Sequence, residues 1–473
     1  MPNGGLAACR GPSARTRTKL MLSASVELAG LSDALRDLNV VVASPRAAIP
    51  RMPASLEEAG VSAALVHQIA LKCLYYRGEI TTRDLTAALG LKFQLIRDIL
   101  ENFKADQYLE VKRSTGGGVL SDLSSILAIT ETGRERAKLY LDVNQYAGPV
   151  PVPLKDYTSQ VMLQKRATGW LRFEALQQAY RSMVITPDIL WQIGPAVNSG
   201  SSFLIYGKPG DGKTYLAESL AEIDPSPIFM PYSIEHMGSI IQIYDPLYHV
   251  PFDKSANPDL EELQPACDGR WLRCRRPFIV SGGELTMEML EMSYNPISKV
   301  YEAPLQTKAN NGIYLVDDFG RQLANPTEVL NRWIVPMDRH QDYLRLQTGG
   351  KIIVPFETFL VFSTNLEPGQ LGDEAFLRRL RYKLLMRGPD EEEYREIFRR
   401  CCVENDFSFE ECAVERFIDK HYRRTNKPFR RCQPRDVIGH AVDLVEFSRG
   451  PRELTDDVLD HAFESCFVTE ALE

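Results

Sequence analysis

Residues 203–214 read Phe203-Leu204-Ile205-Tyr206-Gly207-Lys208-Pro209-Gly210-Asp211-Gly212-Lys213-Thr214. Four apolar residues run directly into a glycine-rich turn, and the turn fits the G-x-x-x-x-G-K-S/T pattern at every fixed position. A helix is expected from about Thr214 to Ala221. A chance match would lack this strand and this helix, so the stretch predicts a phosphate-binding loop in an α/β fold.

The chemistry expected of this loop follows from its residue types. Its glycines carry no Cβ atom, so backbone N–H groups can turn inward around a polyphosphate, and the following helix adds the positive end of its dipole. Lys213 would reach the β- and γ-phosphates, and the Thr214 hydroxyl would bind Mg²⁺. The residues expected to bind ATP are Gly207, Lys208, Pro209, Gly210, Asp211, Gly212, Lys213, Thr214 and Tyr215.

Two further apolar stretches end in polar side chains. Residues 312–316 lead into Asp317 and Asp318, and residues 359–364 lead into Asn365. Asp317 would hold Mg²⁺, mostly through water, and Asp318 would orient or deprotonate the attacking water. The amide of Asn365 would position that water beside the γ-phosphate. Each stretch alone is also compatible with a buried strand and an ordinary turn, and the phosphate-binding loop favours the functional interpretation.

Together these three motifs resemble those of the AAA+ ATPases, with Asn365 at the family's sensor 1 position. The resemblance implies ATP hydrolysis at subunit interfaces of a ring, taken as a hexamer. Residues 372–380 hold Arg378 and Arg379 at the end of an expected helix, where the family places its arginine finger. A finger reaches the nucleotide of the neighbouring subunit. Arg379 is the first choice and Arg378 the second, with a solvated helix end as the alternative.

The C-terminal part, residues 389–473, is expected to form an all-helical lid. Arg435 follows Cys432-Gln433-Pro434 at a helix start, which matches the sensor 2 arginine of the AAA+ family. It would contact the γ-phosphate and convert hydrolysis into lid rotation. Arg430 and Arg431 are weaker candidates, and an ordinary salt-bridging arginine is the alternative.

Residues 331–337 and the hairpin-like residues 343–355 resemble the region of the presensor hairpin in the MoxR-type branch. The similarity to bacterial MoxR-like ATPases covers about residues 160–470 and implies chaperone-like action on a protein client that the motifs do not identify.

The acidic pair after the strand at 312–316 departs from the usual AAA+ pattern. Most AAA+ proteins have Asp-Glu at this place, whereas this chain has Asp317-Asp318, as in the related STAND ATPases. The shorter carboxylate is expected to slow hydrolysis.

The chain before the nucleotide-binding part divides into three segments. Residues 1–54 are expected to be disordered or linker-like, with a short helix near 31–42. Residues 55–145 predict three helices, a strand, a glycine turn at 116–118, a returning strand and a final helix capped at Thr130, which resembles a winged helix. Residues 146–160 contain alternate prolines and predict an extended linker.

A winged helix can read DNA with its third helix and its wing, here with Lys112 and Arg113 on phosphates. The third helix argues against this role because its basic residues are offset by acidic ones. The residues concerned are Lys92, Arg97 and Lys104, and Asp98, Glu101 and Asp106. A protein-contact or spacer role is therefore favoured over nucleic-acid binding.

The composition sets limits on the class of protein. A chain of 473 residues, 44% apolar and 25% charged, predicts a globular protein of about two to four domains. The net charge of −8 gives no general attraction to nucleic acid or to an anionic membrane. The nine cysteines include no C-x-x-C pair, and Cys401, Cys402, Cys412 and His421 fit no standard metal site. No apolar run reaches membrane-span length, and a cytoplasmic location is expected.

The sequence therefore predicts an α/β P-loop AAA+ core over 161–388, a helical lid over 389–473 and an N-terminal winged-helix domain over 55–145. The catalytic residues expected are Lys213, Asp317, Asp318, Asn365, Arg379, Arg378 and Arg435, with Thr214 and Asp317 on the metal. The function expected is an ATPase that remodels a protein partner. The alternatives are a nucleic-acid-associated ATPase or regulator, and an ATP-dependent oligomerisation switch with slow turnover.

Overall fold

The computed structural model describes residues 49–113, 123–167, 169–252, 267–371 and 377–467. The expected helix near 31–42 and the glycine turn at 116–118 lie outside these residues, as do residues 1–48 of the expected N-terminal linker. Within the described part, no helix is long and apolar enough to cross a membrane.

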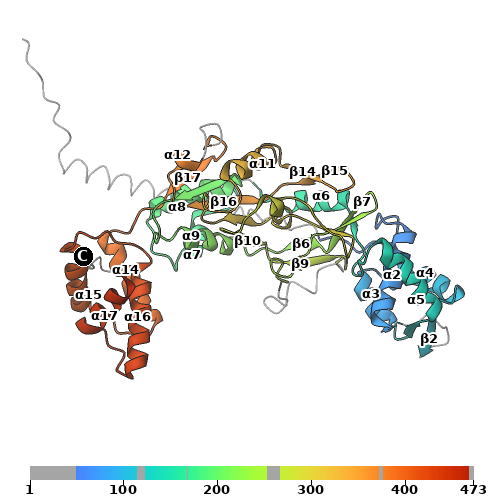
Figure 1. The fold of residues 1–473 in the computed structure, drawn as a ribbon, viewed down its shortest axis with the longest axis horizontal. Helices are drawn as coiled ribbons and strands as arrows, with labels where there is room; N and C mark the ends of the chain where they lie inside the picture. Colours follow the sequence, from blue (N-terminus) through green and yellow to red (C-terminus); the bar gives the residue numbers. More distant parts are fainter. Residues whose placement is uncertain (1–48, 114–122, 168, 253–266, 372–376, 468–473) are drawn as a thin grey trace, which may run out of the picture. The chain divides into compact units, whose positions relative to one another are not determined.

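A five-stranded parallel sheet, of which β10, β16 and β17 are labelled in Figure 1, confirms the predicted α/β core. Its strand order is β10-β13-β16-β5-β17, and every neighbouring pair is parallel. The strands are β5 (Phe203–Tyr206), β10 (Phe278–Ser281), β13 (Ile313–Val316), β16 (Phe359–Thr364) and β17 (Tyr382–Leu385). The three apolar stretches recognised in the sequence are its central strands, as expected for a parallel sheet covered on both faces.

Side chains alternate between two cores along the central strands. Phe203 and Ile205 of β5 point into one core with helices α7, α8 and α9, whereas Leu204 points into the other core with α11. Trp333 of α11 is completely buried there. The helices are α7 (Phe173–Ala179), α8 (Pro187–Ser199), α9 (Lys213–Ser219) and α11 (Pro326–Arg339). Each fully buried large apolar side chain contributes roughly 1.5–3 kcal/mol, so the two cores hold the sheet rigidly under its loops.

The chain between the glycine loop and Asp317 supplies four strands of a second, mixed sheet of order β11-β12-β8-β7-β4, and β4, which precedes the loop in sequence, forms one edge of it. The four strands from this connection and their neighbours form an insertion, because the connection is longer than a single crossover between parallel strands requires. The elements are β4 (Val152–Pro153), β6 (Ile228–Pro231), β7 (Ser233–His236), β8 (Ser239–Gln242), β9 (Trp271–Cys274), β11 (Ser293–Asn295), β12 (Val300–Glu302) and α10 (Leu305–Lys308). The predicted hairpin is also present, as β14 (Gln341–Arg345) paired antiparallel with β15 (Lys351–Pro355).

Two segments differ from the sequence-based expectation. The linker expected at 146–160 instead contains β4, which pairs with β7, and the start of helix α6 (Leu154–Leu163). Pro153 is compatible with both elements, since proline is tolerated at a sheet edge and just before a helix. The methionine-rich residues 287–292, whose sequence predicts a helix, form only the 3₁₀ turn η4 (Met287–Leu290), after which the chain turns into β11.

The N-terminal part combines four helices with a small antiparallel sheet of order β1-β3-β2. The elements are α2 (Ala63–Arg77), β1 (Glu79–Thr81), α3 (Thr82–Leu89), α4 (Phe93–Ala105), β2 (Leu109–Arg113), β3 (Ile126–Ile129) and α5 (Glu131–Val143). Side chains of Ser62, Thr81 and Thr130 cap α2, α3 and α5. Apart from β1, which was not predicted, the elements follow the predicted order, and the winged-helix assignment stays a prediction.

The C-terminal part is helical over its described residues. Asp390 and Glu393 form a capping box at the start of its first helix, and the helices share an aromatic-rich core that includes Phe417 and Phe463. The elements are α14 (Glu391–Glu404), α15 (Glu411–Ile418), the π-helical turn η5 (Asp419–Arg423), α16 (Gln433–Ser448) and α17 (Asp456–Cys466). Two short helices, η1 (Leu220–Glu222) and α12 (Pro368–Leu371), complete the described elements.

Candidate functional site

A cavity of about 420 Å³ lies where the central strands β5, β13 and β16 end. The glycine loop, the acidic turn after β13 and Asn365 after β16 line one side of it, and the C-terminal helices line the other. Ligands of open α/β sheets bind at this carboxyl edge because the loops after parallel strands converge there. Three sequence motifs that together span about 150 residues of the chain thus meet at one site.

Lys213 lies at the centre of these contacts. Its Nζ atom donates to the carbonyl oxygens of Gly207 and Lys208, both at 2.9 Å, and to Oδ1 of Asn365 at 2.5 Å. The side chain is largely buried, and this burial lowers the pKa of Lys213 from its ordinary value, while nearby carboxylates oppose the shift.

The acidic turn is held to the glycine loop and to β16. Oγ1 of Thr214 donates to Oδ2 of Asp317 at 3.0 Å, and the backbone N–H of Asp318 donates to Oδ1 of Asp317 at 3.0 Å. Nδ2 of Asn365 donates to Oδ1 of Asp318 at 2.9 Å. Asp318 has a φ of +48°, a left-handed conformation that short acidic side chains tolerate better than long ones. The backbone itself therefore favours aspartate at position 318.

Two glycines of the loop are required by its geometry. Gly207 has a φ of +149°, and a Cβ atom there would lie 2.2 Å from the carbonyl oxygen of Met386. Gly212 has a φ of +83°, and its Cβ would lie 3.1 Å from Cε of Met183. Both conformations are open to glycine and strained for other residues. The loop can therefore wrap tightly in front of α9.

The donor set suits Mg²⁺ and a polyphosphate. The Thr214 hydroxyl and the Asp317 carboxylate are hard oxygen ligands in mutual contact, which is the chemistry that Mg²⁺ prefers. Lys213, the loop backbone and the amino end of α9 supply the positive counterpart for phosphates. These residues fit the ligands that the sequence predicted.

The three arginines considered for sensor 2 have different surroundings. Arg435 is exposed on α16 and lines the cavity. Arg431 also lines it, but its guanidinium binds Glu393 at 2.9 Å and the carbonyl oxygen of Val184. Arg430 does not line the cavity and instead pairs with Asp211 of the glycine loop. Of these three arginines, Arg435 is thus the one that lines the cavity and makes no ion pair with another residue in the described part of the chain.

Part of the cavity was not foreseen from the sequence. Ser182, Met183 and Val184 come from the segment before α8, and Ile397 and Cys401 come from α14. Apart from Ser182, these residues add apolar side chains to the lining. No motif marks them, because only the folding of two distant segments brings them together. The ion pair between Asp211 and Arg430 was missed as well, although an acid inside a phosphate-binding loop is itself a signal.

The expected binding residues divide into two groups. Pro209, Gly210, Gly212, Lys213, Thr214 and Tyr215 line the cavity, together with Asp317, Asp318, Asn365 and Arg435. Gly207 and Lys208 contribute carbonyl oxygens that accept from Lys213. Asp211 turns its carboxylate away, to Arg430. Its expected contact with the ligand therefore does not involve its side chain.

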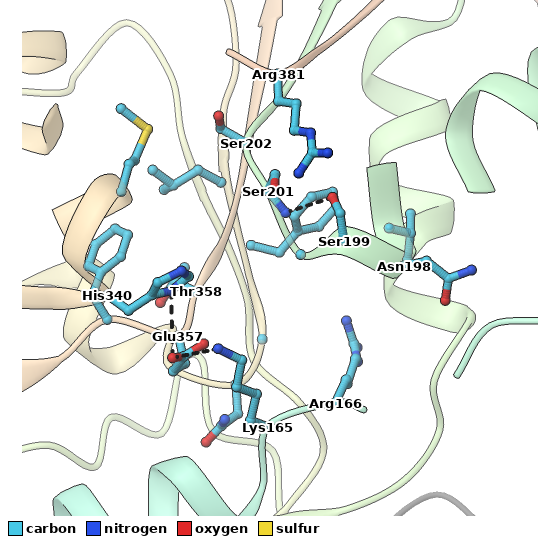
Figure 2. Close-up of a pocket in the computed structure, with 18 of the residues that line it drawn as sticks. Lys165, Arg166, Asn198, Ser199, Ser201, Ser202, His340, Glu357, Thr358 and Arg381 are labelled. Carbon is cyan, nitrogen blue, oxygen red and sulfur yellow. Dashed lines mark hydrogen bonds and ion pairs between the residues drawn. The ribbon is translucent and has the colours of Figure 1, made fainter. Parts of the chain in front are cut away.

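Arg378 and Arg379 lie elsewhere. They line a second cavity, of about 530 Å³, beside the amino ends of β5, β16 and β17, at the edge of the sheet opposite to Lys213. Figure 2 shows this cavity, with Arg381, Ser202, Lys165 and Glu357 on its walls. Arg379 contacts Asp338 at 3.6 Å. Arg378 and Arg379 therefore do not line the cavity of their own chain that contains Lys213.

Two of the cations considered for nucleic-acid binding contact acidic side chains. Arg97 contacts Asp98 at 3.4 Å and Glu101 at 3.8 Å, and Lys112 on β2 pairs with Glu79. These cations are already matched by acids, which weakens any attraction to phosphates. No group of three or more histidine, cysteine, aspartate or glutamate side chains that could hold a metal ion occurs among the described residues.

Comparisons with known proteins gave one family match and several structural likenesses. A family model described as a domain of unknown function (DUF8689) matches residues 390–465, most of the C-terminal helical part. No curated protein matched the sequence.

Among solved structures, NtrX from Brucella abortus is 16% identical over 69% of this chain and 59% of its own, with a TM-score of 0.34. The RuvB Holliday junction branch migration motor of Thermotoga maritima is 15% identical over 63% of this chain and 70% of its own, with a TM-score of 0.33. Domain III of the replication initiation protein DnaA from Thermotoga maritima is 14% identical over 62% and 98%, also with a TM-score of 0.33. At these TM-scores the likenesses identify neither a family nor an activity.

Proposed function

We propose that this protein is an AAA+ ATPase, which binds ATP with Mg²⁺ in the cavity at the carboxyl edge of the sheet and hydrolyses it there. The observation that carries the proposal is the convergence of Lys213, Thr214, Asp317, Asp318 and Asn365 on one cavity. A P-loop lysine, a metal-binding hydroxyl and carboxylate, and a second carboxylate for water are the parts that phosphoryl transfer to water needs.

Each of these residues has a distinct role in the proposed reaction. Lys213 leaves its loop carbonyls to neutralise charge on the β- and γ-phosphates, and Thr214 with Asp317 would hold Mg²⁺, which supplies charge neutralisation when bound. Asp318 accepts the proton of the attacking water or orients it. Asn365, which bridges Lys213 and Asp318, positions that water. Arg435 joins them from α16, the helix that carries the proposed sensor 2.

The proposed enzyme works as a ring, in which Arg379 or Arg378 acts on the nucleotide of the neighbouring subunit. Their place at the opposite edge of the sheet from Lys213 supports this role, because they cannot serve the site of their own chain. Residues 389–473 would be the lid, residues 55–145 a winged helix and residues 161–388 the AAA+ core. The hairpin β14–β15 supports the MoxR-like branch, and a protein client is the proposed substrate of remodelling.

The test is phosphate release by the purified protein with ATP and Mg²⁺, measured over a range of protein concentrations beside its mass in solution. We expect specific activity to rise with concentration as the ring assembles. Activity raised by a client protein and unaffected by DNA would support remodelling over a nucleic-acid-associated role. A protein that remains a monomer with ATP and Mg²⁺ and hydrolyses at full speed would rule out the ring.

A second candidate, a slow ATP-dependent oligomerisation switch, rests on position 318. The carboxylate there is one methylene shorter than glutamate, its backbone is left-handed, and its Oδ1 atom is occupied by the amide of Asn365. These features favour binding and assembly over rapid turnover. Single-turnover hydrolysis with retained ADP would support the switch, and multiple rapid turnovers would exclude it.

A further inference from the structure

Asp211 places a negative charge inside the loop that must receive a polyphosphate. It lies between Gly210 and Gly212, two residues before Lys213, and is only 1% exposed. A carboxylate here repels phosphate oxygens unless a cation neutralises it, and its burial makes an unpaired charge costly. The loop therefore requires a compensating cation from another part of the chain.

Arg430 supplies that cation from the segment before α16. Its Nη1 atom lies 3.1 Å and 3.2 Å from the two carboxylate oxygens of Asp211. A backbone bond strengthens the same junction, since the N–H of Cys432 donates to the carbonyl oxygen of Gly210 at 2.9 Å. The glycine loop is thus tied to the C-terminal helical part by an ion pair and by its own backbone.

The charges of Asp211 and Arg430 both affect the pKa of Lys213. Burial is the main cause that lowers the pKa of Lys213; among the charged neighbours, Asp211 opposes this shift most and Arg430 reinforces it. Gly388 also permits the close approach of the two parts, because a Cβ atom there would lie 2.7 Å from the carbonyl oxygen of Phe429. The pair is therefore packed against the loop and close enough to influence what Lys213 binds.

We propose that Arg430 is a positioning residue that neutralises Asp211 and makes the glycine loop receptive to a polyphosphate only while the C-terminal helical part is docked on it. This inference rests on the proposed function. When the helical part moves away, the Asp211 carboxylate loses its cation and repels the phosphates. ATP binding and the position of the helical part are thereby coupled, and the coupling is reciprocal.

The test is a double-mutant cycle read by calorimetric titration of the full chain with ATP and Mg²⁺. Arg430→Gln leaves Asp211 uncompensated and should weaken ATP binding at least about tenfold. Asp211→Asn removes the repulsive charge and should bind ATP within about threefold of the wild type, a change below about 1 kcal/mol. Asp211→Asn/Arg430→Gln should regain the affinity lost in Arg430→Gln.

Two other roles for Arg430 give different patterns. If the ion pair only holds the glycine loop and the C-terminal helical part together, Asp211→Asn weakens ATP binding as much as Arg430→Gln does. The double variant then regains none of the lost affinity. If Arg430 itself contacts the nucleotide, Asp211→Asn binds normally and the double variant stays weak. Either pattern overturns the proposal. Arg430→Gln should also weaken ATP more than ADP, because ATP carries the additional charged phosphate.

Two control variants separate the effect of the Arg430 charge on ATP binding from an effect on folding. Arg424→Gln removes another arginine of the same helical part, one that pairs with Asp419 at 2.7 Å on the surface, and should bind ATP as the wild type does. Arg430→Lys keeps the positive charge and should retain most of the affinity, which tests the proposal even if Arg430→Gln fails to fold. Wild-type protein that binds no ATP would overturn the proposed function as well, whereas normal wild-type binding with a failed cycle overturns this inference alone.

Discussion

Nζ of Lys213 donates a hydrogen bond to Oδ1 of Asn365 at 2.5 Å, and this contact joins residues 152 positions apart in the chain. The same asparagine donates from its amide nitrogen to Asp318. The phosphate-binding lysine and the carboxylate for water are therefore linked through one side chain. A substitution at any of these three residues should therefore change the hydrogen bonding of the other two.

Lys213→Ala should abolish ATP binding. The substitution removes the buried ammonium group and leaves three oxygen acceptors without their donor. We expect affinity for ATP with Mg²⁺ to fall by at least about 100-fold, measured by calorimetric titration. Lys104→Ala, on the surface of α4, is a matched loss of a lysine and should bind normally. Retention of wild-type affinity in Lys213→Ala would show that the loop is not the phosphate site.

Asp318→Asn should separate binding from hydrolysis. The amide keeps the size of the side chain and tolerates the left-handed backbone at this position, but it cannot accept a proton from water. ATP affinity should stay close to that of the wild type, and kcat should fall by roughly 100-fold or more. Phosphate release and nucleotide titration on the same preparation give both values. Undiminished turnover would remove Asp318 from the reaction.

Arg379→Ala should bind ATP and fail to hydrolyse it, because the missing guanidinium serves a neighbouring subunit. A mixing experiment tests the shared site directly. Arg379→Ala keeps Asp318, and Asp318→Asn keeps Arg379, so a mixture of two inactive proteins should regain part of the activity at interfaces that have both groups. Full activity of Arg379→Ala alone would exclude it as the finger and direct the same test to Arg378.

Gly90→Ala should destabilise the fold without touching the nucleotide site. Gly90 has a φ of +69°, and a Cβ atom there would lie 2.6 Å from the carbonyl carbon of Gly269. The left-handed conformation and the backbone clash together should cost about 2–3 kcal/mol, seen as a lower thermal midpoint. Gly369→Ala, where a Cβ atom would meet nothing within 4 Å, is the matched control and should unfold close to the wild type.

Lys72 should make stability depend on pH in the alkaline range. It is 1% exposed, its Nζ donates to Asn144 at 2.8 Å, and burial lowers its pKa to about 8. Between about pH 8 and 10.4 the unfolded chain binds more protons at this residue than the folded chain, so its contribution to stability rises with pH. Below pH 8 both states are protonated and the cost of the buried charge is constant.

Lys72→Met should remove this cost. We expect the variant to be more stable than the wild type near pH 7, and the advantage to shrink as the pH rises from 8 towards 10.4. Urea unfolding at several pH values measures both effects. A difference between the two proteins that stays constant over this range would contradict the assignment of a buried, titrating ammonium group.

Much of the core was predictable because its signals are local. The strand ending at Tyr206, the glycine loop after it and the apolar run before Asp317 are each written in consecutive residues. Alternation of side chains and capping residues such as Thr130 also act within a few positions of the chain. The length of the connection after the glycine loop predicts only that a segment is inserted, not the second sheet, because the strands of that sheet are short and several pair with partners far away in sequence.

Sequence alone determined the chemistry that this protein can offer: a loop for phosphates, two carboxylates and an asparagine at the ends of buried strands. Tertiary structure decided which of these groups meet and which do not. In the folded chain Lys213 donates a hydrogen bond to Asn365, and Arg379 lies at the opposite edge of the sheet. Asp211 forms an ion pair with Arg430 and does not face the ligand cavity. The physical reason is that backbone conformation depends on neighbouring residues, whereas a contact between side chains depends on how distant segments pack.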